Sequence, residues 1–251
     1  MEDLFGIKPV AEASEKITNA TVDGVSSFLK AVFKPGLEEL GFLIQDKVRQ
    51  WRLNNILRTL EKAKGKLSFD GRELNLSANA RVGLSIMEGC SMVDDDQLQD
   101  LWAGLFVSSC TPDGRDDSNM NFVDLLRRMS SIEARIHDYA CRHCGKRLYP
   151  NKLILADDLT VSFDMLTEIA GTDNLYRLDS ELDHMRSVEL LVHGNIFVSG
   201  GGFSASDDDL EANLTPSPLA LNLFYKTHAI GVSPIDFWGS ELHPIQDNED
   251  N

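Results

Sequence analysis

Cysteine is scarce in this sequence and long apolar runs are absent. The 251 residues contain four cysteines, too few for a disulfide framework, so we expect a protein of the reducing cytoplasm. No apolar run approaches the roughly 20 residues that a membrane-spanning helix needs. Residues 1–17 carry acids and lack the basic start and apolar stretch of a secretory signal. These absences predict a cytoplasmic location.

Motifs of common catalytic and phosphate-binding sites are also missing. The sequence has no GxxxxGK[ST] or GxGxxG loop, no HExxH zinc motif and no GxSxG nucleophile elbow. The acidic loop 111–119 departs from the calcium loop of an EF-hand, and the glycine-rich stretch 198–206 is not followed by a helical pattern. We therefore predict a protein that is not an enzyme, with no catalytic residue, no cofactor and no metal except in the zinc alternative described next.

One cysteine pair has the spacing of half a zinc site. In CRHCGK (141–146), Cys141 and Cys144 form a Cys-x-x-Cys pair, but structural zinc needs four ligands. His137 and His143 are near enough in sequence to contribute a third ligand, and His184 or His193 could complete the set, but there is no second Cys-x-x-Cys pair. We favour a helix end with two free thiols over a zinc site, and a redox pair is the remaining alternative.

Charge is distributed unevenly along the chain. Residues 30–66 hold nine Lys/Arg against four Asp/Glu, a net of +5, whereas residues 151–251 hold four against eighteen, a net of −14. Affinity for nucleic acid comes largely from cations that neutralise phosphates. The acidic C-terminal third therefore disfavours nucleic acid, and the N-terminal third is the better candidate for an anionic partner.

The pattern predicts one long amphipathic helix over about 36–66, after an N-terminal segment 1–35. Apolar residues recur there every three or four positions, including Trp51, Ile56, Leu60 and Ala63. Its polar side is basic, with Lys47, Arg49, Arg52, Arg58, Lys62 and Lys64. We favour a solvated face. The alternatives are contact with anionic lipid at the inner membrane, with nucleic acid, or with an acidic protein partner.

Residues 36–150 are predicted to form this helix and a helical bundle. In DDDQLQDLWAGLFVSS (94–109), the residues Leu98, Leu101, Trp102, Leu105 and Phe106 have the spacing of one buried helix face. Asp94–Asp96 precede that face, where free N–H groups and the helix dipole favour negative charge. We interpret the three aspartates as a helix cap, not a metal site. Further helices are expected over 121–131 and, capped by Ser131, over 132–142.

Residues 151–230 are predicted to form a winged-helix-like α+β part, followed by an acidic tail at 231–251. Ser162 should cap one helix, and Thr172 or Asp173 a second. A strand at 190–200, a loop at 200–209, a return strand and a last helix complete the order. The expected recognition helix, 173–188, has four acids and two arginines. Protein contact is therefore favoured over DNA contact.

Several blocks carry a family resemblance. They include GLEELGFLIQDKVRQWRLNNILRTLEKA, SIMEGCSMVDDDQLQDLWAGLFVSS and NFVDLLRRMSSIEARIHDY, with a weaker part in ELDHMRSVELL and LTPSPLALNLFY. These segments resemble the abortive infection alpha (Abi-alpha) family of bacterial phage-defence proteins. The resemblance implies a role in defence in which an infected cell stops growing or dies. It supplies no catalytic residues. CRHCGK and GGGFSASDDD (200–209) depart from the family pattern.

These observations predict a mainly α protein with a winged-helix-like C-terminal part. We expect a non-enzymatic interaction protein of phage defence that acts through a protein partner. One alternative is a winged-helix DNA-binding regulator. The other is a membrane-surface effector that uses the N-terminal amphipathic segments, including residues 17–45. The sequence predicts no particular oligomeric state.

Overall fold

A computed structural model describes residues 24–25, 27–28, 31–32, 47–68, 75–192, 203–205 and 210–244. The described chain divides into two compact units, and it is mainly helical with small sheets, as predicted. The first unit extends to Arg128 and includes Lys226–Gly231. The second contains Met129–Tyr225 and the residues from Val232 onward. Within these described ranges, no helix combines the length and the apolar content that crossing a membrane requires.

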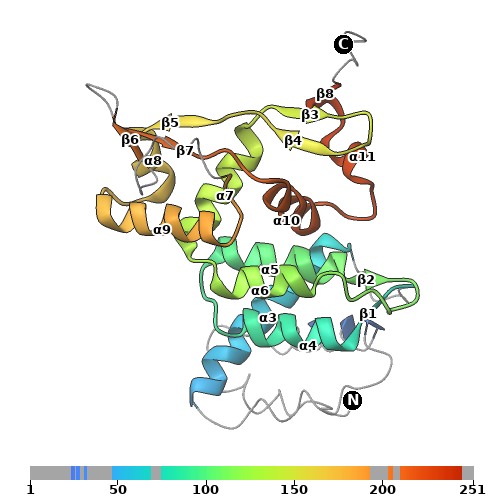
Figure 1. Ribbon diagram of the computed structural model, residues 1–251. Coiled ribbons are helices and arrows are strands. Elements are labelled where there is room, and N and C mark those ends of the chain that lie inside the picture. Colours follow the sequence, from blue (N-terminus) through green and yellow to red (C-terminus); the bar gives the residue numbers. More distant parts are fainter. Residues whose placement is uncertain are drawn as a thin grey trace. The chain divides into compact units, whose positions relative to one another are not determined.

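The first unit is built from helices and one short strand pair (Figure 1). The helices are α3 (Lys47–Lys66), α4 (Ala80–Cys90), α5 (Asp96–Ser108) and α6 (Met120–Arg128). Helix α3 packs mainly against α5, and α4 packs against α5 and α6. Strands β1 (Ser77–Ala78) and β2 (Cys110–Thr111) pair in antiparallel fashion. The predicted helix 36–66 is described from Lys47 onward; its earlier part and most of segment 1–35 lie outside the described residues.

The core of the first unit confirms the predicted face of α5. Leu98, Leu101, Trp102, Leu105 and Phe106 are all buried, and the Phe28 ring meets the Phe106 ring edge-on at 6.0 Å between centroids. Burial of this apolar face, which the sequence pattern predicts, stabilises the first unit.

The sequence prediction is wrong for one residue of the apolar face of α3. Trp51, expected inside, is 39% exposed. The buried stripe consists of Leu53, Ile56, Leu57 and Leu60, which are spaced i, i+3, i+4 and i+7. Successive residues of an α-helix are about 100° apart, so Trp51, two positions before Leu53, lies on the side of α3 opposite the stripe, and its indole is at the surface.

Helix caps decide where several elements begin. Asp95 caps α5 by accepting a hydrogen bond from the Leu98 amide at 2.9 Å, so the capping interpretation is confirmed for this residue. Ser162 caps α8 as predicted. The cap of α7 is Ser130 rather than Ser131, and that of α9 is Asn174 rather than Thr172 or Asp173. Both corrections shift the cap to the residue whose side-chain oxygen reaches an amide three positions later.

The second unit combines helices with two three-stranded sheets (Figure 1). Its helices are α7 (Ser131–His143), α8 (Phe163–Ala170), α9 (Leu175–Ser187), α11 (Pro234–Trp238) and the first part of α10 (Pro218–His228). One sheet has the order β4-β3-β8, from Ile154–Ala156, Lys146–Leu148 and Leu242–Pro244. The other has the order β5-β7-β6, from Thr160–Ser162, Leu210–Asn213 and Phe203–Ala205.

Two segments of this unit differ from the sequence prediction. Phe203–Ala205, expected in a loop, is strand β6, because it pairs with β7. The segment 231–251, expected as an acidic tail, contains α11, the 3₁₀ turn Gly239–Glu241 and β8, which pairs in parallel with β3. The predicted strand at 190–200 falls mostly on residues 193–200, outside the described part, as does the end of the tail.

Candidate functional site

The basic side of α3 faces acids of the same unit. Arg58 Nη2 lies 3.5 Å from Asp96 Oδ1, and Lys62 Nζ lies 3.0 Å from Asp96 Oδ1 and 2.8 Å from Asp100 Oδ2. Arg52 Nε donates to Ser91 Oγ at 3.0 Å. These contacts reduce the positive charge that α3 offers to an anionic partner. Lys47 and Arg49 are helical, but their side chains lie outside the described part.

The four candidate zinc residues are two buried free thiols and two histidines that contact backbone carbonyls. Cys141 and Cys144 are buried free thiols, and burial raises the pKa of each, which makes both poor nucleophiles. His137 Nε2 donates to the Ala220 carbonyl at 3.1 Å, whereas His143 Nδ1 lies 2.8 Å from the Tyr139 carbonyl. Across the described ranges, no three or more His, Cys, Asp or Glu side chains are grouped to hold a metal ion.

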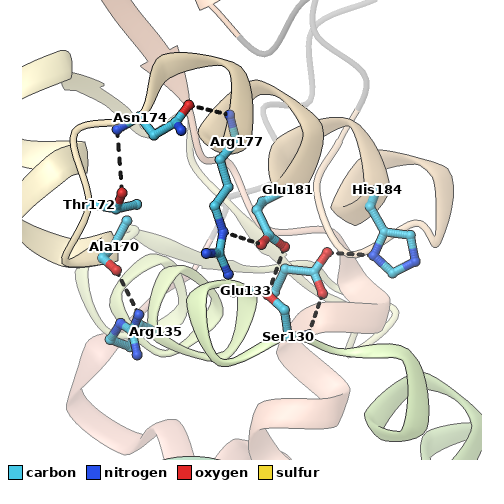
Figure 2. Close-up of polar contacts among 9 residues, drawn as sticks. All are labelled: Ser130, Glu133, Arg135, Ala170, Thr172, Asn174, Arg177, Glu181 and His184. Atoms are coloured by element: carbon cyan, nitrogen blue, oxygen red, sulfur yellow. Dashed lines mark hydrogen bonds and ion pairs between the residues drawn. The ribbon is translucent and has the colours of Figure 1, made fainter.

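A polar cluster joins the start of α7 to α9, and it consists of Ser130, Glu133, Glu181 and His184 (Figure 2). The Ser130 amide donates to Glu133 Oε2 at 2.7 Å, and Ser130 Oγ accepts from the Glu133 amide at 3.1 Å, forming a capping box. The Ser130 hydroxyl also donates to Glu181 Oε2 at 2.7 Å. His184 Nδ1 lies 2.5 Å from Glu133 Oε1. The cluster therefore connects two helices through hydrogen bonds at every member.

Glu133 is the buried centre of this α7–α9 cluster. Its side chain is 1% exposed, and burial raises the pKa of Glu133 more than the Ser130 amide and His184 lower it; the Glu181 charge raises it further. The His184 side chain is 38% exposed. A carboxylate bonded to Nδ1 orients the imidazole ring. The other ring nitrogen, Nε2, is then the one that would accept a proton, as in a histidine general base.

The cluster nevertheless lacks an aligned nucleophile. The Ser130 hydroxyl is directed at Glu181 and its oxygen caps α7, so it does not bond to His184 (Figure 2). A serine–histidine relay needs that bond. The contacts thus favour a structural role in holding α7 against α9. The Ser-x-x-Glu spacing at 130–133 signals the capping box in the sequence, but nothing in it indicates His184, which is 51 positions away from Glu133.

The arginines of α9 are also engaged. Arg177 Nε lies 3.4 Å from Glu181 Oε1 (Figure 2), and Arg186 lies 3.7 Å from Asp183 Oδ1 with only 14% of its side chain exposed. Arg186 also donates to the Asn213 carbonyl at 3.4 Å. The outer surface at the start of α9 is instead apolar, because Tyr176 is 87% exposed and Leu175 is 39% exposed.

Comparison with known proteins gives one match. Neither the curated proteins nor the solved structures contain a significant match to this chain. The sequence model of the abortive infection alpha family matches residues 49–214, which include α3, the α7–α9 cluster and most of both units. Because this match spans more than half of the chain, the protein belongs to the abortive infection alpha family, which associates it with abortive infection, a form of phage defence.

Proposed function

We propose that this protein acts in phage defence as a non-enzymatic, cytoplasmic interaction protein, and that a winged-helix-like part of the second unit docks onto a protein partner. The order β5-α8-α9-β6-β7, with an antiparallel sheet ordered β5-β7-β6, supports the winged-helix assignment. Helices α8 and α9 are joined by a short turn at Gly171, whose φ of 70° suits glycine. In this arrangement α9 is the helix that meets the partner.

The side chains on the surface of α9 favour one class of partner. A helix that reads DNA presents cations to phosphates. On α9, Arg177 pairs with Glu181, and Arg186 is largely buried beside Asp183. Tyr176 is exposed instead, and tyrosine is a residue that protein interfaces favour. This combination of neutralised arginines and an exposed aromatic ring supports a protein partner.

The test replaces Tyr176→Asp. At 87% exposure the side chain contributes little to packing, so the variant should fold normally. Met92→Asp is the matched control, because Met92 is an apolar residue of the first unit that is 59% exposed. In a phage challenge, Y176D should lose protection while M92D retains it, and a photo-crosslinker at position 176 should trap a protein. Full protection by Y176D would refute the proposed docking surface.

Duplex DNA is the second candidate, because winged helices also occur in DNA-binding regulators. This function requires salt-dependent binding that falls when Arg177, the more exposed of the two arginines, is replaced by Glu. A mobility-shift titration at low salt measures it. We expect no shift with the wild-type protein; a shift that Arg177→Glu abolishes would favour the regulator.

The membrane-surface effector stays a prediction. Its amphipathic segment, 17–45, lies almost wholly outside the described residues. Flotation with anionic vesicles tests it directly: protein that rises with the vesicles would favour peripheral contact at the inner membrane.

A further inference from the structure

A cleft in the second unit lies apart from the α7–α9 cluster. It has a volume of about 300 Å³ and lies between the start of β4, the first turns of α10 and α11, which gather on one side of the unit (Figure 1). Its walls include Leu153, Ile154, Leu221 and Trp238. This volume is at the lower end of the range of small-molecule sites, which are typically apolar with few polar groups.

The apolar lining combines exposed and buried side chains. Leu153 is 55% exposed, whereas Leu221 and Trp238 are 3% and 5% exposed. An apolar ligand would cover Leu153, whose exposure to water is unfavourable.

Lys152, beside Leu153, is the basic residue in the lining of the cleft, which also includes the polar residues Asn222 and Tyr225. The other basic side chains of the second unit all have acceptors: Arg142, Lys146, Arg147, Arg177 and Arg186 face carboxylates, and Arg135 donates to a carbonyl. Lys152 has no ion pair and no side-chain hydrogen bond to any residue that the structure describes. Its ammonium group is therefore available to an anion.

The backbone conformation of Lys152 is energetically unfavourable for a lysine. Its φ is 69°, a left-handed conformation that favours glycine or asparagine over lysine. The turn is closed by the Lys152 amide donating to the Tyr149 carbonyl at 2.8 Å and the Tyr149 amide donating to the Leu153 carbonyl at 2.9 Å. Local strain of this kind is often retained where a side chain binds a ligand.

We propose that this cleft binds a small amphipathic carboxylate, with its apolar body against Leu221 and Trp238 and its carboxylate on Lys152. The size of the cavity sets the scale of the ligand, the lining sets its apolar character, and the Lys152 ammonium, which has no partner among the described residues, sets its charge. This site goes beyond the proposed docking function of α9, and its test does not depend on a protein partner.

Octanoate is the probe, and the indole N–H resonances in NMR spectra are the readout. The chain has three tryptophans; Trp51 and Trp102 belong to the first unit and serve as internal references for folding. The Trp238 resonance should shift saturably with octanoate, less with octanol, and least with octylamine, whose ammonium opposes Lys152. The absence of a saturable Trp238 shift up to about 10 mM octanoate would overturn the proposal.

Two variants test the assigned contacts. Lys152→Met should weaken octanoate binding by about two- to fivefold, the range of an exposed ion pair, and leave octanol binding unchanged. Lys66→Met, at the end of α3 in the first unit, is the charge-matched control and should bind octanoate like the wild type. Leu153→Asp should weaken both ligands. Equal binding of octanoate and octylamine, or binding that Lys152→Met leaves unchanged, would show that no anion site exists there.

Discussion

At Gly89, helix α4 lies close against the Trp102 ring of α5. A Cβ atom on Gly89 would lie 2.4 Å from Cη2 and 2.7 Å from Cζ2 of Trp102. Trp102 is fully buried, so its ring cannot rotate into solvent to make room. Gly89→Ala should therefore destabilise the protein, although alanine is the better helix former.

The size of the effect follows from two opposing terms. Overpacking a well-filled core costs typically about 1–3 kcal/mol, and a contact this short on a fixed ring should cost the upper end of that range. Replacing glycine by alanine in a helix interior contributes about 1 kcal/mol in the opposite direction. The net destabilisation is then about 2 kcal/mol, and in a chain of this length it should lower the Tm by about 4–8 °C.

Urea unfolding followed by circular dichroism measures this difference, with Gly65→Ala in α3 as the matched control. A Cβ on Gly65 meets no atom within 4 Å, so that substitution should leave stability unchanged or raise it by up to about 1 kcal/mol. Trp102→Leu removes the obstructing ring, so the double variant should be more stable than the sum of the two single effects by about 1 kcal/mol or more. If Gly89→Ala stabilised the protein as much as Gly65→Ala, the close packing of α4 on Trp102 would be refuted.

Three further predictions concern charged and thiol groups. Burial lowers the pKa of Lys62, but the hydrogen bonds and charges of Asp100 and Asp96 together raise it by more, so its pKa is above the ordinary value. Lys62→Met should therefore lower the free energy of unfolding in urea by about 1 kcal/mol at low salt and by less at high salt. A loss that did not depend on salt would contradict the ion pair. The pKa of Glu133 is raised in the folded protein, so the native state retains a proton that the unfolded chain releases, and the stability of the wild type relative to Glu133→Gln should rise as the pH falls from neutral toward 4.5. If the relative stability instead fell as the pH fell, burial could not be the main influence on the pKa of Glu133. Because burial raises the pKa of Cys141 and Cys144, Ellman's reagent at pH about 8 should leave both unmodified until the protein is denatured, and rapid labelling of the native protein would refute their burial.

Local periodicity predicts the helices of the first unit well. The face of α5 is confirmed at every named position, because a single stripe of large apolar residues has one way to be buried. The same reasoning places Trp51 wrongly, because Trp51 and Ile56 are five positions apart and this spacing does not keep both residues on one helix face. The caps at Ser130 and Asn174 differ by one or two positions from those predicted, because neighbouring Ser, Thr, Asp and Asn residues are almost equivalent as caps.

Local periodicity does not predict contacts between segments that are distant in the sequence. Strand β8 belongs to a stretch whose composition indicates a tail, and only its pairing with β3 makes it a strand. The hydrogen bond between Glu133 and His184 depends on how α7 packs against α9, which no local pattern encodes. The polar side of α3 is predicted as basic, but the sequence does not indicate that its cations meet Asp96 and Asp100.

That last contact changes what the charge distribution means for binding. The net charge of +5 over residues 30–66 suggests an anion-binding surface, yet Arg58 and Lys62 face the acids at the start of α5. In the second unit the arginines of α9 are neutralised in the same way, while Tyr176 remains exposed. A partner that binds α9 through apolar contact around Tyr176 should bind with a weak dependence on salt. A binding constant at α9 that fell steeply with added salt would show that ion pairs carry the binding instead, and would count against apolar docking at Tyr176.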